Sequence, residues 1–452
     1  MNKISIIIYP IISFVAYGCS NDIINNYSDN MQGMSIEGTH VVSIDEAQRV
    51  LEEVLYAKNM RTRSFGSESS VVSSRYVAHF DNSIFSTRAS CDTIEEVDSF
   101  YVFNIGENDG YAIMSSDNRS APILVMTDNG SLSEKTTIEN DVVIGNMADA
   151  QEVYYDEMRN LKSINSVDEC GIIIEYSPWQ TDFYNNEGGM CVVHWGQGYP
   201  YNLLCPNIDG EICLTGCVST AVAQLMSVYS YPYAHDGYSF NWDDMISSSY
   251  DEGIPMLMKL LGEKESLDIS YGLNASSGKL NKVPYAIKHF SYSSGGEVTD
   301  FSANNLINEL ICGYPVLVSG YSEIIHHTTK VLGIKVDSWN EYRGGHLWLA
   351  HGIMRMYRTK KIIDVVNNRV LRTESDNYYY IMYNFGWSGY ADGYYLLGNF
   401  DTNKGADYSS STRSIVNEME SDSIGDPNNS ELNQNTPFNY QFKNKIIWGI
   451  RK

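Results

Sequence analysis

The sequence predicts an α+β protein in which a helical section precedes an antiparallel β section, with a smaller α+β unit in front of both. Apolar residues recur at helical spacing over 44–55 and in four segments between 217 and 312. Aromatic and alternating runs typical of strands occupy 100–127 and several segments after 314. Helices followed by antiparallel strands favour a helical lobe packed against a β lobe, with a cleft between them.

The 452 residues are enough for two or three domains with a large core. Hydrophobic residues make up 43% of the chain and aromatic residues 12%, which argues against a disordered scaffold. The formal charge of −25 is spread along the chain without a basic run. This balance disfavours nucleic acid and anionic lipid surfaces as partners.

The N-terminus indicates export. Residues 1–18 are expected to be a signal peptide, because a mostly apolar run follows Met-Asn-Lys and is too short to span a bilayer. Cys19 follows Gly18 in a pattern that resembles the lipobox of bacterial lipoproteins, so we expect lipidation of Cys19, with ordinary signal cleavage as the alternative. The protein is then an outer-membrane or cell-surface lipoprotein, attached to the membrane only through this anchor.

The smaller unit comes first in the chain. Residues 19–42 have no periodicity and are expected to be the lipoprotein tether. A capping box from Ser43 to Glu46 opens the first helix. Further on, Asn108-Asp109-Gly110 joins two strands as a hairpin, and 121–127 follows as a third strand. We expect this helix-plus-hairpin unit to be a small domain of its own, at 43–165.

The second unit, 166–452, is long enough for one α+β domain. An acidic, polar insert before its last strand is expected to form a surface loop. The expected helices lie around 217–229, 253–262, 279–290 and 303–312, the strands around 314–322, 346–358, 377–385, 393–397 and 445–450, and the insert at 403–437.

Cys217 stands between a small flexible turn and an apolar helical pattern. Val218, Ala221 and Leu225 mark a buried face, so the helix begins at or just after Cys217. A thiol at the positive end of a helix dipole is favoured as the thiolate. Gly216 leaves room for another backbone, such as a bound peptide. From this stretch alone, a buried structural cysteine fits equally well.

A thiol nucleophile needs a base, and His346 stands at the start of an apolar strand, directly after Gly344 and Gly345. It follows Cys217 by about 130 residues, a separation found in papain-like proteases. The two glycines clear space in front of the imidazole and are assigned to the substrate cleft. A lone surface histidine is the alternative interpretation.

Three further residues complete the candidate site. Asn384 can hold the imidazole in one tautomer, and Trp387 can shield that bond from water. The amide of Gln197, together with the backbone N–H of Cys217, would form an oxyanion hole for a tetrahedral intermediate. The alternatives are core packing for the aromatic residues and a loop hydrogen bond for Gln197.

The remaining cysteines and histidines predict no metal site and no cofactor. Apart from Cys19 the chain has seven cysteines, an odd number that leaves at least one thiol unpaired or paired between molecules in an exported protein. Their spacing lacks the paired pattern of a zinc site, and His326, His327 and His351 form no convincing ligand set.

Five ordered motifs carry a family resemblance. The segments "WGQGYPYNLLCP", "TGCVSTAVAQLM", "YGLNASSGKL", "GGHLWLAHG" and "YNFGWSGYADGYYLL" follow one another as in the streptopain family of secreted bacterial cysteine proteases, which the chain resembles. The segments "VSIDEAQRVL" and "YVFNIGENDGYAIMSSDNRSAPILVMTDNG" resemble the propeptide of that family. The likeness spans residues from about 40 to 400 and the last strand.

The resemblance implies a papain-like two-lobe cysteine protease made as a zymogen, in which Cys217 attacks a peptide carbonyl and His346 is its partner. It implies that 43–165 is an inhibitory propeptide, which disturbs the catalytic histidine until it is cut off between about Arg159 and Trp179. The partners are then protein or peptide substrates and the chain's own propeptide. The expected activity is a broad endopeptidase that favours a hydrophobic residue two positions before the cleaved bond.

By position, Gln197 and Asn384 correspond to the oxyanion glutamine and the asparagine of the family. The family's Asn-Trp-Gly-Trp reads Asn-Phe-Gly-Trp here, so Phe385 replaces the first Trp. Two other functions stay open: an amidase acting on cell-wall peptides with the same Cys and His, and a surface binding or adhesion lipoprotein on an inactive protease scaffold.

Overall fold

The computed structural model describes residues 40–61, 71–79, 99–132, 172–185, 189–331, 334–364, 366–397, 423–424, 440 and 442–452. The expected signal peptide, Cys19, nearly all of the tether, the region around Arg159 and all but two residues of the acidic insert lie outside them. No helix among the described residues is long and apolar enough to cross a membrane.

The described part of the N-terminal unit is a helix on a four-stranded antiparallel array. Helix α1 (Ile44–Arg61) begins as the capping box predicts, since the Glu46 N–H donates to Ser43 Oγ at 3.2 Å. Strand β1, which the polar sequence around it did not predict, pairs with β2. The strands are β1 (Val72–His79), β2 (Ser99–Ile105), β3 (Tyr111–Ser115) and β4 (Ile123–Thr127).

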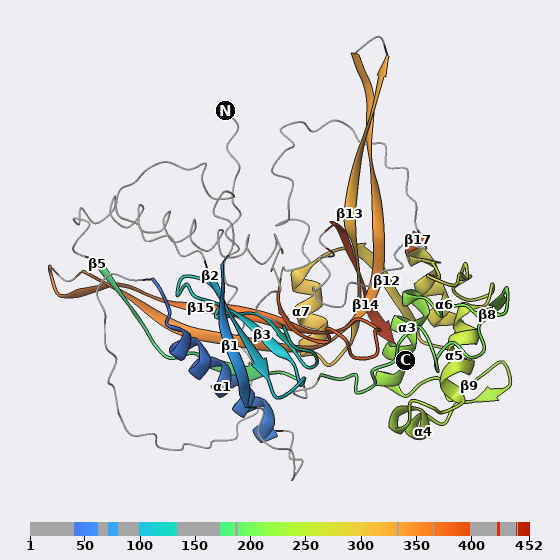
Figure 1. Cartoon of the computed structure of the whole chain (residues 1–452), viewed down its shortest axis with the longest axis horizontal. Helices are drawn as coiled ribbons and strands as arrows, with labels where there is room; N and C mark the ends of the chain where they lie inside the picture. Colours follow the sequence, from blue (N-terminus) through green and yellow to red (C-terminus); the bar gives the residue numbers. More distant parts are fainter. Residues whose placement is uncertain are drawn as a thin grey trace. The chain divides into compact units, whose positions relative to one another are not determined.

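This unit does not have a sheet or a core to itself. Strand β4 pairs with β16 (Gly393–Leu396), so the N-terminal strands continue the sheet of the second unit (Figure 1). Leu51 and Phe103 belong to the same buried cluster as Trp348 and Tyr380. The expected small domain is therefore one end of a shared twelve-stranded sheet.

The rest of that sheet is antiparallel and includes two long strand pairs. Strands β13 and β14 run side by side well beyond the predicted 314–322 and 346–358, and the far part of β14 pairs with β15, β5 and β6. The bounds are β5 (Ile172–Tyr176), β6 (Gln180–Phe183), β12 (Ser294–Asp300), β13 (Val316–Val331), β14 (Ile334–Asp364), β15 (Arg369–Asn384) and β18 (Phe442–Arg451).

The helices between 217 and 289 form a separate lobe around a second buried cluster, which includes Val222, Leu257 and Ile287, whereas the last helix buries Leu306 and Leu310 in the first cluster. Four of the five helices confirm the prediction, and the short α4 was missed. The helices are α3 (Cys217–Tyr229), α4 (Trp242–Ser247), α5 (Gly253–Gly262), α6 (Val283–His289) after the 3₁₀ turn η3 (Leu280–Lys282), and α7 (Ala303–Ile311). The short strands are β7 (Asn207–Ile208), β8 (Glu211–Ile212), β9 (Ala234–His235), β10 (Tyr238–Ser239), β11 (Gly278–Lys279) and β17 (Ser423–Ile424).

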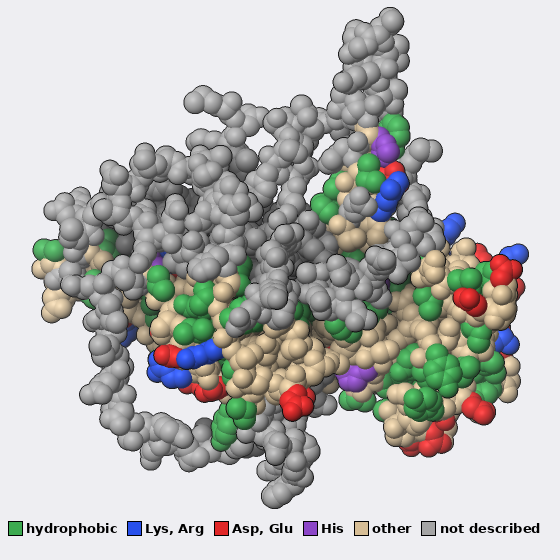
Figure 2. All heavy atoms as spheres, in the orientation of Figure 1, with side chains coloured by type: hydrophobic (Ala, Val, Ile, Leu, Met, Phe, Trp, Pro, Cys, Tyr) green, Lys and Arg blue, Asp and Glu red, His purple; other side chains and the backbone are tan. Residues whose placement is uncertain are grey.

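The structure confirms the α+β class, with a helical lobe, an antiparallel β lobe and a small α+β unit before them. Figure 2 shows Asp and Glu side chains over the helical lobe, where Asp243, Asp244 and Glu252 are exposed.

Candidate active site

Cys217 is the first residue of α3, as predicted. The preceding Gly216 has a φ of 83°, and a Cβ there would lie 2.7 Å from the carbonyl oxygen of Ser276. A backbone that approaches Gly216 closely is thus that of Ser276 in the chain itself. Only glycine readily adopts this positive φ and also leaves room for the Ser276 carbonyl oxygen, so the turn before Cys217 requires a glycine at position 216.

The Cys217 thiol is 4% exposed and lies against the backbone N–H groups of Leu347, Val218 and its own residue. These donors favour the thiolate, but burial outweighs them and raises the pKa of Cys217 to about 11. Burial therefore disfavours the thiolate that the helix N-terminus was expected to stabilise.

His346 lies in β14, directly before Leu347, so α3 and β14 bring Cys217 and His346 to the same place. Its Nε2 is 2.8 Å from the carbonyl oxygen of Phe385. A carbonyl only accepts, so Nε2 carries the proton and Nδ1 is the nitrogen that can take one. Burial lowers the pKa of His346 to about 4, so the imidazole is neutral. In the described part of the chain, no hydrogen bond joins Cys217 to His346.

Aromatic rings enclose the imidazole. The ring of Trp387, which was expected to shield this site, has its centroid 4.7 Å from that of His346, and Tyr440 stacks on the imidazole at 5.2 Å. Burial raises the pKa of Tyr440, and a negative charge on Cys217 raises it further, so this phenol also lies near the thiol. Tyr440 was not predicted, because it follows the polar insert and precedes the last strand without any pattern of its own.

Asn384 does not contact the imidazole that it was expected to orient. Its Oδ1 accepts from Gln224 Nε2 at 2.7 Å and from the Gly386 N–H at 3.0 Å, and its Nδ2 donates to the carbonyl oxygen of Val193 at 2.8 Å. Through these bonds the Asn384 amide joins three parts of the chain: α3 at Gln224, the segment before α3 at Val193, and the turn after β15 at Gly386. In this structure the backbone carbonyl of Phe385 holds the tautomer instead.

Asp392 is a buried positioning residue that the sequence did not reveal. One of its carboxylate oxygens accepts from the Phe385 N–H at 2.9 Å, and the other lies 3.0 Å from His194 Nδ1. The bond to Asp392 raises the pKa of His194. The backbone of Phe385 is thus held through both its N–H and its carbonyl, and the Trp-to-Phe change at 385 alters a ring without altering the carbonyl that is used.

The other predicted residues lie at the edges of this site. The Gln197 carbonyl accepts from the Thr215 N–H at 3.0 Å, which fixes its loop beside the start of α3, and its side-chain amide makes no hydrogen bond with the described residues. Gly344 has a φ of 64° and backs onto Ser322, and Gly345 pairs with Tyr321 in β13. Both glycines therefore shape the strand edge before His346.

One group among the described residues has the side chains to hold a metal ion. Ligand atoms of His235, Asp236 and His289 lie within 4.8 Å of one another, on β9 and at the end of α6. The His235 ring stacks on Phe290. This group shares no residue with the site around Cys217, and the chemistry considered below uses none of it.

The two buried histidines predict a loss of stability in mild acid. Burial lowers the pKa of His346 to about 4 and that of His351 to about 3, whereas imidazoles in the unfolded chain titrate near pH 6.5. Stability is therefore full above pH 6.5 and falls as the pH drops toward 4, because only the unfolded chain takes up these protons. The loss is on the order of 3 kcal/mol for His346.

Urea unfolding of the full chain between pH 7 and pH 5 measures this effect. The His346→Gln variant should show a weaker dependence on pH than the parent. An equal dependence in the two proteins contradicts the assignment of this proton uptake to His346.

Two family models match this chain. Residues 195–395, which contain Cys217 and His346, match the Peptidase C10 family, and residues 39–144 match the Spi protease inhibitor. The class of protein is therefore a cysteine-type endopeptidase with an inhibitor-type propeptide domain. More particularly, the resemblance to the streptopain family is confirmed.

Individual relatives agree with these matches. Streptopain of Streptococcus pyogenes is 25% identical over 349 residues, which cover 66% of this chain and 74% of streptopain. The thiol protease/hemagglutinin PrtT of Porphyromonas gingivalis is 27% identical over 156 residues, 32% of this chain and 17% of that protein.

Solved structures with some likeness come from Prevotella intermedia. A prointerpain A fragment aligns with a TM-score of 0.36 at 18% identity, over 71% of this chain and 91% of the fragment. Active interpain A aligns with a TM-score of 0.31 at 20% identity, over 46% of this chain and 85% of that one.

Proposed function

We propose that this cysteine endopeptidase uses Cys217 as its nucleophile and His346 as the partner that takes and returns the proton. One observation carries the proposal. The Cys217 thiol lies against the N–H of Leu347, and the adjacent His346 has its Nε2 proton engaged by the Phe385 carbonyl. Nδ1 is then the nitrogen left to accept the thiol proton.

In the proposed reaction, Nδ1 of His346 takes the proton of Cys217, and the sulfur attacks the peptide carbonyl carbon. The oxyanion is held by the Cys217 N–H and the Gln197 amide. In support, the first N–H groups of a helix have no acceptor within it, and the Gln197 loop is bonded to Thr215. His346 then protonates the leaving amine, and water hydrolyses the acyl-enzyme with His346 as the base.

Asn384, Trp387 and Asp392 support this chemistry without touching the reacting atoms. Asn384 and Asp392 hold the turn that presents the Phe385 carbonyl, and Trp387 covers the imidazole. Gly344 and Gly345 are assigned to the edge of the substrate cleft. Broad specificity, with a hydrophobic residue two positions before the cleaved bond, is part of the proposal.

We propose the following organisation for the exported zymogen. Residues 1–18 are a signal peptide, 19–42 a tether lipidated at Cys19, 43–165 the inhibitory propeptide and 166–452 the protease domain. The buried thiol and the neutral imidazole are features of an inactive form, which supports an inhibitory role for the propeptide. A cut upstream of β5 would break the covalent link between the protease and the lipid anchor.

Substrate choice tests this function. The matured protein is incubated separately with casein and with purified peptidoglycan, with and without a thiol-directed epoxide. We expect new casein peptides that the epoxide suppresses, and no release of peptides from peptidoglycan. Cleavage of peptidoglycan alone would assign a cell-wall amidase, and binding without cleavage of either substrate would assign an adhesion protein on an inactive scaffold.

A further inference from the structure

Arg358 of β14 reaches across the junction between the protease and the propeptide region. It is only 6% exposed, and its guanidinium donates to the carbonyl oxygen of Asn118 and, through Nε, to Asp376 at 2.9 Å. The same guanidinium lies 3.7 Å from the ring centre of Tyr176 and 4.2 Å from that of Trp179. The buried guanidinium of Arg358 therefore joins three parts of the chain: the propeptide region, β15, and the segment with Tyr176 and Trp179, which lies between the inhibitor match and the peptidase match.

The propeptide side of this contact is a rigid turn. Asp117 and Arg119 form an ion pair at 2.6 Å with both side chains fully buried, and the Ser115 and Ser120 hydroxyls bond to each other. The Asn118 N–H donates to the carbonyl oxygen of His40. These bonds fix the direction of the Asn118 carbonyl that Arg358 binds, so the turn is presented to Arg358 already ordered.

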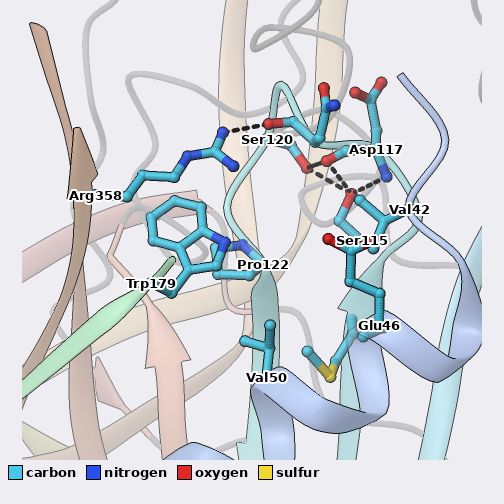
Figure 3. Close-up of a pocket in the computed structure, with 12 residues that line it drawn as sticks. Val42, Glu46, Val50, Ser115, Asp117, Ser120, Pro122, Trp179 and Arg358 are labelled. Carbon is cyan, nitrogen blue, oxygen red and sulfur yellow. Dashed lines mark hydrogen bonds between the residues drawn. The ribbon is translucent and has the colours of Figure 1, made fainter. Parts of the chain in front are cut away.

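Figure 3 shows the two sides facing each other across a hollow of about 50 Å³. Arg358 and Trp179 lie on one side, and Ser115, Asp117 and Ser120 on the other, with α1 closing the hollow at Glu46 and Val50. Apart from Arg358 and Trp179, the residues that line it belong to the propeptide region.

Tyr176 and Trp179 come from the segment that follows the proposed cut. Strand β5 pairs with β14 from Ile172 opposite Asp364 to Tyr176 opposite Lys360, and β6 pairs with the next part of β14. Strands paired in this way must open before a protease can bind them, so a first cut is favoured upstream of Ile172. After such a cut, Tyr176 and Trp179 still pack on Arg358.

We propose that Arg358, Tyr176 and Trp179 form an anchor that keeps the propeptide bound after the first cut, and that propeptide release requires a second step that displaces or trims the segment 172–179. The inference rests on the proposed zymogen. The bond to Asn118 is charge-assisted and buried, and the two rings hold the guanidinium in place. Other bonds also join the propeptide region to the protease: the pairing of β4 with β16 from Val125 to Thr127, the Asp128 N–H donating to the Asp392 carbonyl oxygen at 2.8 Å, and the Tyr378 hydroxyl donating to the Arg119 carbonyl oxygen at 3.5 Å. The bond from Arg358 adds a buried charge to these contacts.

The test measures propeptide release from a full chain that cannot process itself. A Cys217→Ala chain is given a recognition sequence for a sequence-specific protease at Arg159 and is attached to a solid support by its C-terminus. The sequence-specific protease is then added to cut the chain at that position. The dissociation rate of the propeptide is compared for this parent, Arg358→Ala, the Tyr176→Ala/Trp179→Ala double variant and Arg355→Ala.

Arg355 is the matched control on the same strand. It pairs with Asp182 at 2.6 Å and lies over Tyr357, both outside the propeptide. We expect the parent and Arg355→Ala to retain the propeptide, and Arg358→Ala and the double variant to lose it at least about tenfold faster. The milder Arg358→Lys variant should give an intermediate dissociation rate, because lysine keeps the positive charge but lacks the planar guanidinium that donates in two directions.

Equal rates for the Arg358 variants and Arg355→Ala would overturn the anchor. So would prompt release from the parent upon the cut. Because an external protease cuts a chain without Cys217, neither result depends on whether Cys217 is the nucleophile, and the proposed catalytic function is tested separately.

Discussion

Replacing Cys217 with Ala is expected to abolish casein cleavage and any self-processing, with a loss of at least about 10⁴-fold in kcat/KM, because no other group can form the acyl-enzyme. The measurement is casein hydrolysis by the variant after its propeptide has been cut by an added protease and removed, so that failure to mature does not mask the result.

Cys213→Ala is the matched control. Cys213 is a fully buried thiol four residues upstream of Cys217, and it occupies no place in the proposed chemistry. This variant should keep its activity. Equal losses in the two variants would point to a structural effect of either cysteine and contradict a nucleophilic Cys217.

The second large effect is expected at His346. The His346→Ala variant removes the acceptor for the thiol proton, and we expect a loss of about 10³-fold or more in kcat/KM. It should also slow alkylation of Cys217 by iodoacetamide at pH 6 in the matured protein, a readout that a purely structural role would not change selectively.

His289→Ala serves as the comparison, since His289 is an exposed histidine of the helical lobe. It should leave both casein cleavage and alkylation of Cys217 as in the parent. Normal activity in His346→Ala would rule out His346 as the proton acceptor.

The sequence predicted the elements whose apolar pattern is regular. The bounds of α3 and α5 agree with the prediction residue for residue, because both helices bury a continuous face. Strand β1 and the far halves of β13 and β14 were missed, because polar and charged residues in them obscure the alternation. The shared sheet was also missed, since the pairing of β4 with β16 joins segments far apart in the sequence.

In the candidate site, too, the sequence predicted some of the groups and missed others. Cys217, His346 and Trp387 were predicted from side-chain types and spacing, and the structure brings all three to one place. The group that holds the imidazole is the backbone carbonyl of Phe385, and a backbone group has no residue type by which to recognise it. Asp392 was missed because no pattern in the sequence links its carboxyl group to the Phe385 N–H seven residues earlier.

The protonation of Cys217 could not be predicted from position alone. A helix N-terminus lowers the pKa of a thiol, but the depth of burial, which only the fold determines, raises it to about 11. We therefore expect activation to change the surroundings of Cys217 and His346.

Covalent labelling tests the central claim most directly. The matured protein is titrated with a thiol-directed epoxide, and casein cleavage and the mass of the peptide containing Cys217 are followed on the same samples. The account predicts that activity falls in proportion to modification of Cys217. Full activity with Cys217 completely modified, or loss of activity with Cys217 unmodified, would contradict it.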